Sequence, residues 1–68
     1  MNNYYILSPV YNDWKSLKKL LLKIDSNLKS LSGKVEFIAI NDGSTTKPNL
    51  KIKYLNNIDK IKIINLKK

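Results

Sequence analysis

Residues 35–46 read VEFIAINDGSTT, and this stretch decides the fold class. Its first six residues, 35–40, are almost all apolar, which is typical of a strand buried on both faces of a parallel sheet. The polar residues 41–46 follow directly and are of the types that form turns and helix caps. A buried strand that ends in a polar loop is typical of α/β sheets, whose ligands bind beyond the carboxyl ends of the strands.

The sequence upstream of this strand fits a β-α unit. Residues 4–8, YYILS, form a short apolar and aromatic run that Pro9 ends, because proline has no N–H to donate to a sheet. Asn12 and Asp13 can each cap a helix. An apolar stripe follows at spacings of three and four, formed by Trp14, Leu17, Leu21, Ile24, Leu28 and Leu31. This stripe predicts a helix of roughly 18 residues, with Ser32-Gly33 ending it through a left-handed glycine.

Downstream, the sequence favours a second helix and a third strand. Pro48 suits the first position of a short helix, whose apolar face would be formed by Leu50, Tyr54, Leu55 and Ile58. Residues 61–66, IKIINL, have the pattern of a strand. The order β-α-β-α-β requires crossovers between parallel strands. We therefore predict one mononucleotide-binding, Rossmann-like half of a doubly wound α/β sheet, with the strand order 3-2-1, formed by residues 1–68 as one domain.

The composition excludes several kinds of chemistry. The 68 residues include no cysteine, histidine or arginine, so disulfides, cysteine–histidine zinc sites and catalysis by histidine or cysteine are ruled out. Catalysis by Asp, Glu, Lys, Ser or Tyr remains open. No apolar run is long enough for a membrane-spanning helix, and the N-terminal residues have no signal-peptide pattern, so we expect a cytoplasmic protein.

Thirteen lysines against five acids give a net charge of +8, which is compatible with nucleic acid or an anionic membrane as a partner. However, the lysines are scattered, and arginine, the residue best suited to guanine and phosphate contacts, is absent. We therefore expect no specific nucleic acid as a partner. A solvated surface is the simplest interpretation, and a patch for nucleotide phosphates or anionic lipid is the alternative.

Neither a dinucleotide-binding glycine motif nor a Walker A loop is present. Instead, two polar clusters, residues 9–13 and 41–45, follow the first and second predicted strands and should converge at one sheet edge. A tyrosine ring such as that of Tyr11 can stack on a base, which is worth roughly 1–3 kcal/mol, and a carboxylate can accept from the ring N–H of uracil or guanine. Structural roles are the alternative: Asp13 as a helix cap, residues 41–44 as a simple turn, and Tyr11 packed on the helix.

Together, the two clusters resemble the start of the family 2 glycosyltransferases, which have the GT-A fold. Residues 5–13, YILSPVYND, look like the family's opening strand with Pro-x-Tyr-Asn-Glu. Residues 36–45, EFIAINDGST, look like its Glu-Ile-Ile-x-Val-Asp-Asp-Gly-Ser-Thr, with Asn41 in place of the first aspartate. Asp13 is shorter than the family's glutamate, and Thr46 stands where aspartate is common. Within the family, the chain looks nearest to the dolichyl- and polyprenyl-phosphate sugar transferases.

The resemblance implies that this chain binds the nucleoside of a UDP- or GDP-sugar. Pro9 and Tyr11 match positions that line the base pocket, and Asp42 matches the aspartate that holds the base. Asp13 matches an acidic position that contacts the nucleoside. The full set of implied nucleotide-binding residues is Pro9, Tyr11, Asp13, Asp42, Gly43 and Ser44, the last two shaping the loop.

The resemblance also implies what a complete enzyme would do. It would transfer a sugar with inversion to a lipid phosphate or a glycan, using a divalent metal ion (Mg or Mn). The family's metal motif and catalytic base lie downstream of the matched segments, so the resemblance implies a truncated chain with no catalytic residue, no metal ligand and no transferase activity of its own. The cytoplasmic face of a membrane is then an alternative location to the cytoplasm.

Two rival functions remain. The first is a small, basic, nucleic-acid-binding α/β module, whose affinity would fall steeply with salt and depend little on Tyr11. The second is a doubly wound signalling domain similar to response regulators, which would need a phosphorylatable aspartate after the third strand, where this chain has Asn65. In a truncated half-sheet, the edge of the third strand and the apolar helix faces that the missing half would cover are left bare, which predicts self-association.

Overall fold

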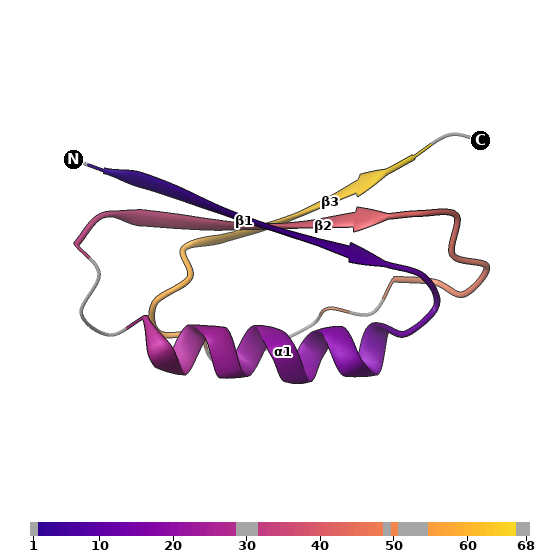
Figure 1. Ribbon diagram of the computed structural model, residues 1–68, viewed down its shortest axis with the longest axis horizontal. Coiled ribbons are helices and arrows are strands. Elements are labelled where there is room, and N and C mark those ends of the chain that lie inside the picture. The colour runs from indigo at the N-terminus through magenta and orange to yellow at the C-terminus, as the bar shows by residue number, and fades with distance from the viewer. Residues whose placement is uncertain (1, 29–31, 49, 51–54, 67–68) are drawn as a thin grey trace.

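The computed structural model describes residues 2–28, 32–48, 50 and 55–66 (Figure 1). Its elements follow the chain as β1 (Asn3–Val10), α1 (Trp14–Asn27), β2 (Lys34–Asn41) and β3 (Lys60–Asn65). All three strands are parallel and lie in the order β1-β2-β3, so β2 is the central strand. The α/β class and the three parallel strands are confirmed.

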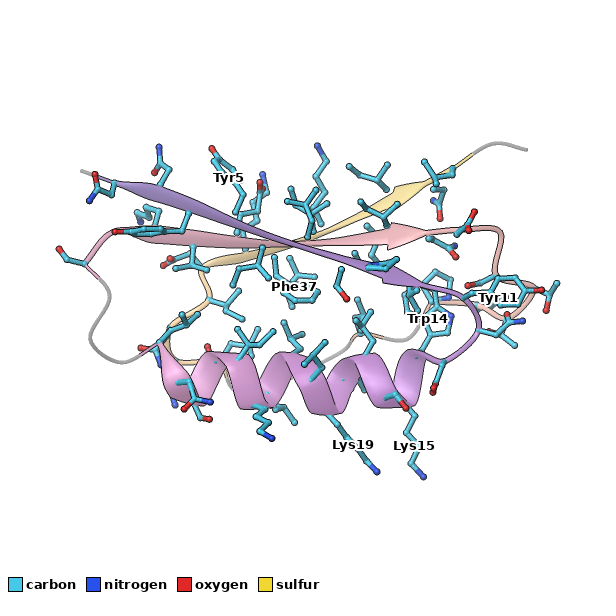
Figure 2. All side chains as sticks on the ribbon, in the orientation of Figure 1. Tyr5, Tyr11, Trp14, Lys15, Lys19 and Phe37 are labelled. Atoms are coloured by element: carbon cyan, nitrogen blue, oxygen red, sulfur yellow. The ribbon has the colours of Figure 1, made fainter. Side chains whose placement is uncertain are left out.

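The core lies between β2 and α1. Phe37 of β2 is fully buried and points toward the helix, as Figure 2 shows, and Leu21 of α1 is also fully buried. The complete core cluster consists of Val10, Trp14, Leu17, Leu21, Val35, Phe37, Ala39 and Ile58. These residues alternate along β2 and recur every three or four positions along α1, as burial of one strand face and one helix stripe requires.

Within the described part of the chain, only one face of the sheet is covered by a helix (Figure 1). Ile38 and Ile40 of β2 point to the other face and are only half-buried. Tyr5 and Leu7 of β1 point the same way, and each is 60% exposed. The run of apolar residues in β2 therefore does not correspond here to a strand covered on both faces.

Helix α1 is shorter than its apolar stripe predicts. It ends at Asn27 with Leu28 as its C-cap, whereas Leu31 lies outside the described residues. Near this end, Ser26 Oγ and Asn27 Nδ2 both donate to the carbonyl oxygen of Lys23, at 2.9 and 2.8 Å. Such side-chain bonds compete with the hydrogen bonds that continue a helix, which accounts for the early end.

Gly33 does not end the helix, and this expectation is wrong. It lies immediately before β2 with φ +138°, a conformation that favours glycine. A Cβ at this position would collide with the backbone oxygen of Asn2. Glycine is therefore required where the chain enters β2 beside the start of β1.

The predicted second helix falls largely on residues 49 and 51–54, which lie outside the described residues. Four residues expected in this helix are described, and none of them is helical: Pro48, Leu50, Leu55 and Ile58. The third strand begins and ends one residue earlier than predicted. The first strand does not end at Pro9 as expected, but continues through it to Val10. Among the described residues β1 pairs only with β2, and an edge strand tolerates a residue that has no N–H to donate.

A buried carboxylate in α1 fixes the segment that leads into β3. Asp25 is only 4% exposed and accepts hydrogen bonds from the backbone N–H groups of Asn56, Asn57 and Ile58, at 2.9, 2.8 and 2.8 Å. The Nδ2 of Asn57 also donates to the backbone oxygen of Asp25, at 2.6 Å. Burial raises the pKa of Asp25, but the three backbone hydrogen bonds together outweigh it and hold the pKa below its ordinary value.

A membrane-spanning helix was not expected, and no described helix has the length and apolar character needed to cross a bilayer.

Candidate functional site

The polar loops after β1 and β2 meet at one edge of the sheet, as predicted. Val10 and Asn41, the last residues of these two strands, are paired in the parallel register. Immediately beyond them, the N–H of Asp42 donates to the carbonyl oxygen of Val10, at 2.9 Å. We call this region, residues 11–13 and 42–46, the site edge. Figure 2 shows Tyr11 and Trp14 lying at this end of the molecule.

Asn12 joins the two loops. Its N–H donates to Ser44 Oγ at 2.8 Å, and its Oδ1 accepts from the N–H groups of Thr45 and Thr46, at 2.7 and 3.1 Å. Both threonine hydroxyls also lie within hydrogen-bond distance of this oxygen. Asn12 has φ +61°, and asparagine is one of the few non-glycine residues that adopt this conformation readily.

The sequence suggested only a helix-capping role for Asn12, so its role in joining the loops was missed. The usable signal was an asparagine in the loop after the first strand and a run of serine and threonine hydrogen-bonding groups 32 to 34 positions downstream. A single sequence does not reveal which conformation such an asparagine adopts.

Asn41, the last residue of β2, stabilises the site edge through its hydrogen bonds. It is 8% exposed, its Oδ1 accepts from Ser44 N at 3.0 Å, and its Nδ2 donates to Asn65 Oδ1 at 2.8 Å. Its backbone oxygen accepts from Leu66 N at 3.0 Å. The family resemblance has aspartate at this position, which has no hydrogen to donate to Asn65. Asparagine therefore suits a position that bonds the loop on one side and β3 on the other.

Three of the six predicted nucleotide-binding residues share one hollow. Pro9, Tyr11 and Asp13 line a depression of about 210 Å³ beside the first turns of α1. Tyr11 is 60% exposed, so most of this residue is accessible to a ligand. Asp13 caps α1, with Oδ1 accepting from Ser16 N at 3.2 Å, which is the structural role considered for it from the sequence.

The other three predicted residues belong to the site edge but do not line this hollow. Asp42 and Ser44 are half-buried, and Ser44 uses its hydroxyl to accept from Asn12. Gly43 is exposed and has φ +77°, so its turn requires a residue that tolerates a left-handed conformation. The structure thus brings the two clusters together at one edge, with Tyr11 and Asp42 on neighbouring loops.

A buried donor lies close to the site edge. Trp14, the first residue of α1, is 5% exposed, and its indole Nε1 has no hydrogen-bond partner among the residues that the structure describes. The sequence predicted a packing role for this residue, and its place in the core cluster confirms that role.

A larger hollow, about 320 Å³, lies at the opposite ends of the strands. Three of its four charged side chains are already engaged: Lys60 lies 3.7 Å from Glu36, and Asp59 accepts from Val35 N at 2.8 Å. Ligands of parallel α/β sheets bind at the carboxyl ends of the strands. The site edge, with its polar loops, is therefore the better candidate despite the smaller volume.

The residue types needed for a metal centre do not gather in the described part of the chain, where no three potential ligands form a group. Comparison of the chain with protein-family models, curated proteins and solved structures gave no match. Any functional assignment therefore depends on the two motifs and on the geometry of the site edge.

Proposed function

We propose that this chain is the donor-binding part of a family 2-like glycosyltransferase, a GT-A half-sheet of strand order 3-2-1 that binds the nucleoside of a UDP- or GDP-sugar at the site edge. One observation carries the proposal: Asn12 joins the loops after β1 and β2 by direct hydrogen bonds. These two loops hold both predicted motifs. A base-binding site built from both motifs needs such a fixed arrangement, because preorganised groups lose less freedom when a ligand binds.

The side chains at this edge have the chemistry that a nucleoside requires. The exposed ring of Tyr11 offers a flat apolar face for a base, worth about 1–3 kcal/mol. Asp42 would accept from a base N–H, and Gly43 would let the backbone approach the ligand closely. Asp13 uses Oδ1 to cap α1, so its Oδ2 could accept from a ribose hydroxyl.

The proposal assigns donor recognition, and no chemical step, to residues 1–68. Sugar transfer with inversion needs a carboxylate base for the acceptor and a divalent metal ion or basic groups to stabilise the leaving diphosphate. In the complete enzyme, the acceptor would be a lipid phosphate or a glycan. We expect the chain by itself to bind UDP or GDP without turnover of the corresponding sugar nucleotides.

The test compares two tyrosines that are equally exposed. UDP and GDP are titrated into the chain, with binding followed by calorimetry and by the fluorescence of Trp14. Tyr11→Ala should weaken binding by about five- to 150-fold, the equivalent of one stacked base, and Asp42→Ala should also weaken it. Tyr5→Ala, a matched control because both tyrosines are 60% exposed, should have no effect.

Two competitors identify which part of the nucleotide is recognised. Uridine or guanosine should compete with the nucleotide, whereas inorganic pyrophosphate should compete poorly. Competition by pyrophosphate alone, or equal effects of the two tyrosine variants, would refute base recognition. Tight binding of a DNA duplex that falls steeply with salt and ignores Tyr11→Ala would favour the nucleic-acid-binding alternative.

A further inference from the structure

The outer face of α1 carries a row of three lysines. Lys15, Lys19 and Lys23 are exposed and spaced four residues apart, so they follow one side of the helix over about 12 Å. Figure 2 shows Lys15 and Lys19 pointing away from the sheet. We call these three residues the lysine line, and half-buried Lys18 lies beside it.

The lysine line has no ion-pair partner in the part of the chain that the structure describes. The only acid in α1 is Asp25, which is buried and bonded to residues 56–58. Asp13 is engaged in capping the start of the helix. The outer face of α1 is therefore a surface of uncompensated positive charge that complements an array of phosphates.

Two exposed leucines flank the lysine line. Leu20 and Leu22 are 44% and 46% exposed, and with 3.6 residues per turn they lie about 100° to one side of Lys19 and about 60° to the other. Contacts to a nucleic-acid backbone come from charged and polar groups and give leucine no role. At a bilayer surface, lysines meet the headgroups while leucines reach the boundary with the acyl chains.

We propose that the outer face of α1 binds an anionic lipid surface, with the helix axis parallel to the membrane. The lysine line meets the headgroup phosphates and carboxylates, and Leu20 and Leu22 enter the interface on either side. The covered face of the sheet packs on the opposite side of α1 (Figure 1), so docking requires no change in the core. The proposal stands independently of nucleoside binding.

The test is cosedimentation of the full chain with vesicles of phosphatidylcholine alone or with added phosphatidylserine. Binding should require phosphatidylserine and fall with salt. Each lysine near an anionic surface contributes about fivefold to the binding constant, so K15Q/K19Q/K23Q should lower it about a hundredfold. The matched control K34Q/K47Q/K62Q removes the same charge from exposed lysines elsewhere and should bind nearly as well as the unaltered chain.

Two further measurements distinguish binding to lipid headgroups from binding to nucleic-acid phosphates. Neither measurement requires that K15Q/K19Q/K23Q folds. L20S/L22S should weaken vesicle binding and leave binding to a DNA duplex unchanged. Acetylation of the unaltered chain should be slower at Lys15, Lys19 and Lys23 when vesicles are present. Equal loss of binding in both triple variants, no protection of these lysines, or tighter binding to DNA than to anionic vesicles would overturn the proposal.

Discussion

Replacing Asp25 with asparagine should remove a large part of the stability of the fold. The carboxylate is 4% exposed and accepts three backbone hydrogen bonds, two at Oδ1 and one at Oδ2. In Asp25→Asn, the amide oxygen can keep the bonds from Asn57 and Ile58. The amide nitrogen then faces the N–H of Asn56, so two donors oppose each other in a partly buried position.

The magnitude follows from these three contacts. One partly buried donor without a partner costs about 1–3 kcal/mol, and each remaining bond loses about 1 kcal/mol because its acceptor is no longer charged. The free energy of unfolding should therefore fall by about 3–5 kcal/mol. A domain of this length has a total of only about 3–10 kcal/mol, so the variant should lose about a third of its stability or more.

The assay is urea unfolding followed by the fluorescence of Trp14 and by circular dichroism. Asp13→Asn is the matched control, because it removes the same charge but leaves an equally good helix cap. It should change the free energy of unfolding by no more than a few tenths of a kcal/mol. A loss below about 1 kcal/mol in Asp25→Asn would show that the backbone bonds of this carboxylate contribute little.

The pH dependence provides a second check on Asp25. Its pKa is lower in the folded chain than in the unfolded one, so its stabilising contribution is complete above the unfolded value of about 3.9. It is lost as the pH falls through the folded value. The difference in stability between the unaltered chain and Asp25→Asn should therefore be constant near neutral pH and shrink below about pH 4. A difference that persists to lower pH would contradict a contribution from the charge.

Two further substitutions test the ends of the sheet. Gly33→Ala should lower the free energy of unfolding by more than about 1 kcal/mol, because the residue has φ +138° and its Cβ would collide with the oxygen of Asn2; an unchanged urea midpoint would contradict this. Asn12→Gly keeps the backbone conformation but removes the acceptor for Thr45 and Thr46, so it should cost about 1–2 kcal/mol and shift both amide resonances. Asn12→Asp retains the acceptor and should leave these resonances nearly in place; large shifts in both variants would show that the acceptor oxygen is not what joins the loops.

Much of the fold was predictable because its signals are local. The apolar stripe of α1 and the run of residues 35–40 each follow from periodicity, and the parallel arrangement follows from the crossover that the helix supplies. The end of α1 was not predictable from the stripe. It depends on how Ser26 and Asn27 bond to one carbonyl, and the same residue types are also compatible with a continuing helix.

For the site, the sequence predicted where the loops meet but not what joins them. Convergence of the two clusters follows from topology alone, because parallel strands bring their carboxyl ends to one edge. The bonds of Asn12 to residues 44–46 and of Asp25 to residues 56–58 join segments more than 30 positions apart. Such bonds depend on the register of the finished fold. The nucleotide-binding roles of Pro9, Tyr11, Asp13, Asp42, Gly43 and Ser44 stay predictions, as does self-association through the sheet edge at the third strand.

The two proposals involve different parts of α1, so they can be tested separately. Nucleoside binding depends on the N-terminal end of the helix, where Asp13 and Trp14 lie beside the site edge. Lipid binding depends on its outer face, where the lysine line is directed away from both the sheet and the core. If both proposals hold, Tyr11→Ala will reduce UDP or GDP affinity while leaving vesicle binding intact, and K15Q/K19Q/K23Q will do the reverse. A lysine variant that lost both affinities while remaining folded would instead indicate a single anion-binding surface that includes the nucleotide phosphates.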